Sequence, residues 1–198
     1  MDALLWSDYL CPWCYVGQVR TAKLRELGLA VTALPFELHP EIGPAGRTVR
    51  SDGRLGPTFD RIEAECDEAG LPFRRPTRMP NTHRALATAE VVRTEWPEAF
   101  DALDTALFAA QFATGDPLDD SEVIDSLVSA SGAPADEVRD RVADIGDTVL
   151  AASMAAARDA GVAGTPTWVV GSLTIPGALP TETLERWVRR LLERATPD

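Results

Sequence analysis

The sequence has little positive charge. Its 198 residues include 19 lysines and arginines against 31 aspartates and glutamates, which gives a formal net charge of −12 at pH 7. Lys23 is the only lysine in the chain. Proteins that bind the phosphates of a nucleic acid present a basic surface to them. We therefore expect no nucleic-acid partner.

Long apolar runs are also missing. No stretch approaches the roughly 18 apolar residues that a membrane-spanning helix needs. The first residues, Met1 to Trp6, lack the basic region, long apolar stretch and cleavage site of a secretory signal. We therefore expect a cytoplasmic protein with no membrane partner. In that reducing compartment, two cysteines placed close together are more often catalytic or metal-binding than part of a structural disulfide.

The start of the chain predicts a β-α-β unit. Residues 3–7 form a short apolar run that is typical of a buried strand, and residues 30–38 predict a second strand. Between them, a helix can begin at Pro12 and end at Gly28. Because the crossover is so short, the two strands should be parallel and connected in the right-handed sense.

The middle of the chain predicts helices. Residues 40–57 are rich in glycine, proline and arginine and predict a loop, whereas residues 58–161 show helical signals and no strand. The signal from Pro97 continues through Phe112. Helix starts are expected near residues 58, 82, 97, 121, 134 and 147.

Strand signals return near the C-terminus. Residues 167–170 and 173–175 predict a hairpin around Gly171-Ser172, and Thr181 caps an amphipathic helix. The order is therefore β-α-β, a helical block, and β-β-α. This order predicts an α/β fold with helices on both faces of a small sheet. The helical block is an insertion between the two halves.

The motif Cys11-Pro12-Trp13-Cys14 follows a predicted strand and opens a predicted helix. Unpaired backbone N–H groups and the positive end of the helix dipole would face the Cys11 sulfur there. Both lower a thiol pKa and favour the nucleophilic thiolate. Cys14 lies one helical turn further on, within reach of a disulfide. The pair could therefore exchange disulfides, with Cys11 as the attacking thiolate and Cys14 as the resolving thiol.

Two other readings of the cysteine pair stay open. A structural zinc site needs four ligands, and beyond the pair the chain supplies only Cys66, His39 and His83. We therefore expect no metal. Two unrelated buried cysteines are the remaining alternative, but the position between a strand and a helix favours redox chemistry.

Four segments resemble the DsbA-like thioredoxin superfamily. Asp8-x-x-Cys11-Pro12-Trp13-Cys14-Tyr15-x-Gly17 is similar to its opening motif, and Gly161-Val162-x-Gly164-Thr165-Pro166-Thr167 to its Gly-Val-x-Gly-Val-Pro segment. Pro35-Phe36-x-Leu38-x-Pro40 and the weaker Asn81-Thr82-x-Arg84 are the other two. The resemblance is strongest to the FrnE-like branch, named for a dithiol–disulfide isomerase of polyketide biosynthesis.

This resemblance implies a thioredoxin-like fold with a large all-helical insertion. Residues 1–57 and 162–198 would form the thioredoxin-like domain, and residues 58–161 the insertion. It also implies that the bond before Pro166 is cis, whereas an ordinary X-Pro bond is more often trans. Pro12, Trp13, Thr165 and Pro166 would then shape the substrate groove beside the cysteines.

Three residues depart from the family pattern. Thr165 replaces the usual valine before the proline, at a position that tunes redox direction. Leu5 stands where many thioredoxin-like proteins carry a buried acid, so the proton acceptor must lie elsewhere; Asp8 is a candidate, although it could equally form a turn. Trp13 cannot offer the thiolate a positive charge as a histidine can. We therefore expect a less strongly oxidising couple than that of a periplasmic oxidase.

Other chemically active side chains have ordinary explanations. Cys66 shares a helix face with apolar residues and is expected to be a buried structural thiol. His83 would lie on an insertion helix near the motif, where a substrate contact is possible, as it is for Asn81. His39 is expected to be a structural or surface residue.

The sequence therefore predicts a cytoplasmic thiol–disulfide oxidoreductase or isomerase that acts on a disulfide-containing protein or a small thiol or disulfide. No tightly bound cofactor is required, and glutathione could serve as redox partner. The alternative is a glutathione-dependent isomerase or transferase of the 2-hydroxychromene-2-carboxylate isomerase or kappa-class type. Those enzymes have serine at the position of Cys11. A non-catalytic thiol-holding protein is a third possibility, and the oligomeric state is not predicted.

Overall fold

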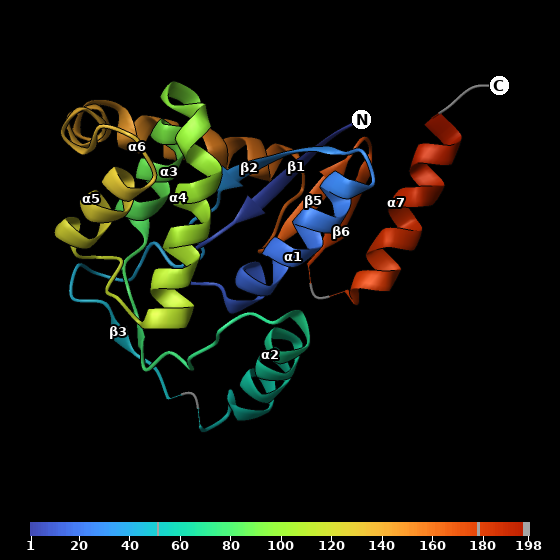
Figure 1. Cartoon of the computed structure of the whole chain (residues 1–198), viewed down its shortest axis with the longest axis horizontal. Coiled ribbons are helices and arrows are strands. Elements are labelled where there is room, and N and C mark those ends of the chain that lie inside the picture. Colours follow the sequence, from blue (N-terminus) through green and yellow to red (C-terminus); the bar gives the residue numbers. More distant parts are fainter. Residues whose placement is uncertain (51, 178, 196–198) are drawn as a thin grey trace.

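The computed structural model describes residues 1–50, 52–177 and 179–195. A four-stranded sheet in the order β2-β1-β5-β6 lies at its centre (Figure 1). β1 (Asp2–Ser7) and β2 (Ala30–Pro35) are parallel, as predicted. β5 (Thr167–Val170) pairs antiparallel with β1, and β6 (Leu173–Pro176) pairs antiparallel with β5. The two ends of the chain therefore build one sheet.

Helices cover both faces of this sheet. α1 (Pro12–Glu26) and α7 (Thr181–Ala195) pack on one face (Figure 1). Their shared core includes Leu24 of α1, Trp168 of β5 and Val188 of α7. On the opposite face, Trp6 and the end of α6 (Ala135–Asp159) form a second cluster. The predicted α/β layer is confirmed.

The helical insertion leaves the sheet after β2 and returns at β5. Its largest core lies among its own helices and extends to the cysteine motif at the start of α1. The motif is therefore held between the sheet and the insertion. The other helices of the insertion are α2 (Gly56–Ala69), α3 (His83–Glu95), α4 (Pro97–Ala109) and α5 (Ser121–Ala130).

Two short strands were not predicted. β3 (Arg47–Thr48) lies in the region read as a loop, and it pairs antiparallel with β4 (Arg78–Met79) inside the helical block. The prediction of no strand in residues 58–161 was therefore wrong. Each strand has two residues, too few for an alternating pattern to show in the sequence.

Several helix bounds also differ. The predicted starts near 134 and 147 belong to one continuous helix, α6, in which Gly146 brings the backbone close to Ala87 of α3. This glycine marks a close packing contact and not a break. The helix predicted to continue from Pro97 through Phe112 changes at residue 110 to a π-helix, η1 (Ala110–Thr114).

The remaining differences are shifts of a few residues. α2 begins at Gly56, so Thr58 is not its cap, because Pro57 already suits the first turn. Thr181 is the first residue of α7 and not its cap. β2 ends at Pro35, before the predicted residue 38. None of the helices in the described residues is both long and apolar enough to cross a membrane.

Candidate active site

Cys11 stands at the junction of β1 and α1. It is the N-cap of α1, and Pro12 occupies the first helical position as predicted. The Cys11 N–H donates to the Asp8 carbonyl at 3.0 Å, and the Cys14 N–H donates to the Cys11 carbonyl at 3.0 Å. These bonds fix a tight turn that begins the helix. Both cysteines therefore lie in the first turn of α1.

The two thiols are free and nearly buried. Cys11 is 6% exposed and Cys14 is 3% exposed. The Cys11 thiol donates to the Thr165 carbonyl at 3.5 Å, and the Thr165–Pro166 peptide bond is cis. Segments that are far apart in the sequence, the α1 start and the entry to β5, therefore meet at the Cys11 sulfur.

The environments of the two sulfurs shift the pKa values of Cys11 and Cys14 in opposite directions. The Cys14 side chain, which can hydrogen-bond to the Cys11 sulfur, lowers the pKa of Cys11 in spite of burial. The Thr165 side chain and the Cys14 backbone N–H act in the same direction. Burial, and then Cys11 itself, raises the pKa of Cys14 well above its usual range. Cys11 is therefore the more readily ionised thiol of the pair.

Trp13 lies under a cation that the sequence did not reveal. The Arg61 guanidinium carbon sits 4.8 Å from the centroid of the Trp13 ring, within the range of a cation–π contact. The Arg61 Nε also donates to Glu65 at 3.3 Å, and Glu65 accepts a hydrogen bond from Arg20 of α1. The Trp13 side of the motif is thus tied to α2. No local spacing connects residues so far apart.

The buried Asp8 carboxylate accepts hydrogen bonds from three segments of the chain. It accepts the Leu10 N–H at 3.1 Å, the Leu38 N–H at 2.8 Å and the Thr82 hydroxyl at 2.8 Å. Burial raises its pKa from 3.8 to about 6, although these three donors lower it. The bond to Leu10 makes the turn that the sequence allowed. The other two join the motif to the end of β2 and the start of α3.

Asn81 and His83 hold the same region together. The Asn81 amide donates to the Ile42 carbonyl at 2.5 Å, and its oxygen accepts the His83 N–H at 3.1 Å. The His83 ring lies 3.1 Å from Glu37 and 3.0 Å from Asp147. Partial burial lowers the pKa of His83, but these two carboxylates outweigh it and raise the pKa. Both ring nitrogens already have carboxylate partners.

The remaining candidates lie apart from the reacting sulfurs. Cys66 is fully buried, as predicted, and burial raises its pKa to about 11. His39 pairs with Glu41 at 2.9 Å on the surface. Neither residue contacts Cys11 or Cys14 through a hydrogen bond in the described part of the chain.

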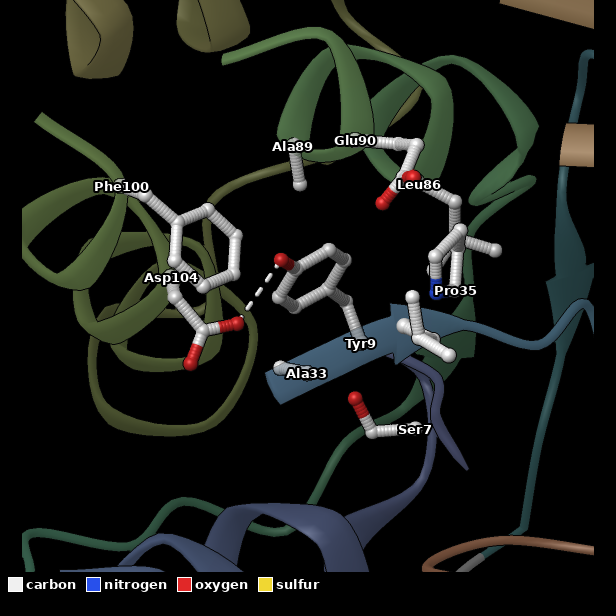
Figure 2. A pocket seen from close by; sticks show the side chains of 10 residues that line it. Ser7, Tyr9, Ala33, Pro35, Leu86, Ala89, Glu90, Phe100 and Asp104 are labelled. Carbon is white, nitrogen blue, oxygen red and sulfur yellow. Dashed lines mark hydrogen bonds between the residues drawn. The ribbon is translucent and has the colours of Figure 1, made fainter. Parts of the chain in front are cut away.

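A small cavity lies next to Tyr9, between β2, α3 and α4 (Figure 2). The Tyr9 hydroxyl donates to Asp104 of α4 at 2.9 Å, and Glu90 of α3 points toward the same space (Figure 2). Burial raises the pKa of Asp104 to about 6. The cavity has room for about one water molecule. It therefore serves the packing of Tyr9 and is too small for a substrate.

Residues 4–189 match the DSBA-like thioredoxin domain family. A probable DsbA oxidoreductase from Streptomyces coelicolor is 25% identical, with a TM-score of 0.87 over 100% of this chain and 92% of that one.

Two further structures share the fold. 2-Hydroxychromene-2-carboxylate isomerase is 20% identical, with a TM-score of 0.80 over 98% of this chain and 97% of that one. The cytosolic disulfide reductase DsbM from Pseudomonas aeruginosa, solved with GSH, is 19% identical, with a TM-score of 0.73 over 98% of both chains. The family match runs along residues 4–189, nearly the whole chain, and by it the chain belongs to the DsbA-like thioredoxin domain family.

Proposed function

We propose that the protein is a thiol–disulfide oxidoreductase or isomerase that exchanges disulfides through Cys11-Pro12-Trp13-Cys14. The observation that carries this proposal is the difference between the two thiols. The surroundings lower the pKa of Cys11 and raise that of Cys14, and both lie in one helical turn. Cys11 is therefore suited to attack as a thiolate, and Cys14 stays protonated until the mixed disulfide has formed.

The exchange proceeds in two steps. The Cys11 thiolate attacks one sulfur of the substrate disulfide, forms a mixed disulfide and releases the other substrate sulfur as a thiolate. Cys14 then loses its proton and attacks the Cys11 sulfur, which closes the Cys11–Cys14 disulfide and releases the second substrate thiolate. The substrate gains two electrons and the protein loses two. The reverse sequence donates a disulfide.

Thr165, Pro166, Pro12 and Trp13 would shape the substrate groove. The Thr165 carbonyl already accepts a hydrogen bond from the Cys11 thiol. The Thr165 hydroxyl is buried without a hydrogen-bond partner in the described residues, and a hydrogen bond from it to either sulfur would lower the pKa of that cysteine. This supports Thr165 as a residue that stabilises the thiolate.

Asp8 is our candidate for the proton acceptor of Cys14. Its pKa of about 6 lets it change protonation near neutral pH. The Asp8 backbone is among the groups that lower the pKa of Cys14, which supports Asp8 as a neighbour of the second sulfur. His83 and Asn81 would act by holding the Asp8 region, and a direct contact between either residue and substrate remains a prediction.

Glutathione is the redox partner that we propose, with no tightly bound cofactor and no metal. DsbM, which shares the fold, was solved with GSH. Two molecules of glutathione would reduce the Cys11–Cys14 disulfide and leave as glutathione disulfide. The substrate would be a disulfide-containing protein or a small disulfide, and the cytoplasm remains the predicted compartment.

The test is a redox titration in glutathione buffers of stepped ratio, with the state of each cysteine read by mass spectrometry. We expect a reversible two-electron transition of Cys11 and Cys14, with Cys66 unchanged. Cys14→Ser should accumulate the mixed disulfide on Cys11, and Cys11→Ser should abolish exchange.

A different result would favour the glutathione-dependent isomerase or transferase. If the pair never closes, or if Cys14 is dispensable for a glutathione-dependent reaction, the oxidoreductase proposal is wrong. If Cys11→Ser leaves the cellular function intact, a thiol-holding role replaces both.

A further inference from the structure

A groove of about 510 Å³ runs along α1, between α2 and the start of α7. Figure 1 shows these two helices beside α1. Val16 and Val19 of α1 line it, together with Ala69 at the end of α2 and Pro180 before α7. Val19 is 37% exposed, which is unusual for a large apolar side chain in this protein. The groove therefore has an apolar floor of the size that a long side chain needs.

The groove is acidic. Three glutamates, Glu65, Glu68 and Glu182, line it against a single base, Arg20. Arg20 is buried and bound to Glu65, which also pairs with Arg61 at 3.3 Å, so the Glu65 carboxylate is already neutralised. Glu68 and Glu182 are exposed, and neither has an ion-pair partner among residues 1–50, 52–177 and 179–195. Two carboxylates without an ion-pair partner in the described residues thus line the same groove, one near the end of α2 and one at the start of α7.

The groove lies within reach of the reacting sulfur. Val16 and Arg20 follow Cys11 on α1 by five and nine residues. At a rise of 1.5 Å per residue, they lie about 8 and about 14 Å from Cys11 along the helix axis. An extended peptide spans about 3.3 Å per residue. A substrate joined to Cys11 and extended along α1 would therefore cover this axial distance with its second to fourth residue.

We propose that this groove binds the lysine or arginine side chain of a disulfide substrate, two to four residues from the cysteine that reacts with Cys11. The inference rests on the proposed function and adds the substrate class. The aliphatic part of the side chain packs on Val16 and Val19, as long charged side chains do on apolar surfaces. Its charge lies between Glu68 and Glu182, which are the specificity-determining residues. The net charge of −12 steers basic partners toward the protein.

The experiment compares two peptides with an internal disulfide. They are identical except for arginine or glutamate three residues from one cysteine. Wild-type protein is mixed with each peptide and with glutathione, which regenerates the Cys11–Cys14 dithiol after each turnover, and kcat/KM for peptide reduction is measured. Peptide binding to Cys11→Ser is measured separately by fluorescence anisotropy, because that variant cannot exchange disulfides. The test variant carries Glu68→Gln and Glu182→Gln. The control carries Glu98→Gln and Asp140→Asn, two exposed acids on other helices.

We expect a preference of about fivefold for the arginine peptide, the size that two exposed ion pairs give. It should appear in KM and in binding to Cys11→Ser. The test variant and 0.5 M salt (a concentration of roughly this size screens exposed charges) should both abolish it. The control should keep it. Equal use of both peptides, or a preference that the test variant retains, overturns the inference. If neither peptide is reduced, the proposed function fails. Binding of the two peptides to Cys11→Ser then still shows whether the groove prefers the arginine peptide.

Discussion

The buried guanidinium of Arg20 depends on Glu65 for its charge balance. The Arg20 side chain is 2% exposed, and its Nη2 donates to the Glu65 carboxylate. Its Nε and Nη1 are buried and have no other partner in the described residues. Glu65→Gln keeps the shape of the side chain but leaves this cation without a counter-charge. Breaking a buried ion pair from one side costs about 3–5 kcal/mol. Because Glu65 is 24% exposed, we expect a loss near the lower end, about 3 kcal/mol.

The assay is urea unfolding at neutral pH, followed by tryptophan fluorescence. Glu68→Gln is the matched control, since it removes an exposed acid from the same helix and should change the free energy of unfolding by about 0.5 kcal/mol or less. The double variant Arg20→Met with Glu65→Met should recover most of the loss, because neither charge remains buried. The reasoning is refuted if Glu65→Gln costs no more than Glu68→Gln.

Three further predictions concern the site. The Asp8 carboxyl has a pKa of 3.8 in the unfolded chain and about 6 in the folded protein, so between these values the folded state binds the proton more tightly. The free energy of unfolding of the wild type should therefore fall by about 3 kcal/mol relative to that of Asp8→Asn as the pH rises from about 4 to above 6. Urea midpoints across this range measure it, and a pH-independent difference contradicts it. Gly177→Ala should cost about 1–3 kcal/mol by thermal unfolding, since its Cβ would overlap the Pro166 ring and carbonyl, whereas Gly17→Ala meets Pro166 at 3.5 Å and should be tolerated. Iodoacetamide should spare Cys66, which is fully buried with a pKa of about 11; peptide mapping that finds it modified in the native protein would show local opening.

The sequence alone located the cysteine motif and the order of the main elements. A strand followed by Pro12 at a helix start is a local pattern, and so is the hairpin around Gly171-Ser172. Steps of two and of three to four residues report which face of an element is buried. Such signals need only a few neighbouring residues, so the α/β layer and the helical insertion could be predicted from them, whereas the thioredoxin-like fold was implied by the resemblance of the motifs.

Tertiary structure decided what surrounds the sulfurs. Asp8 meets Leu38 and Thr82, and Arg61 covers Trp13, through contacts between distant segments. Gly146 likewise packs against Ala87 of α3 within one continuous α6, where the sequence predicted two helices. Local spacing determines which elements form because neighbouring residues share one backbone geometry. It does not determine which of them contact one another across the core. In this protein those tertiary contacts set the charge and the pKa of the reacting groups.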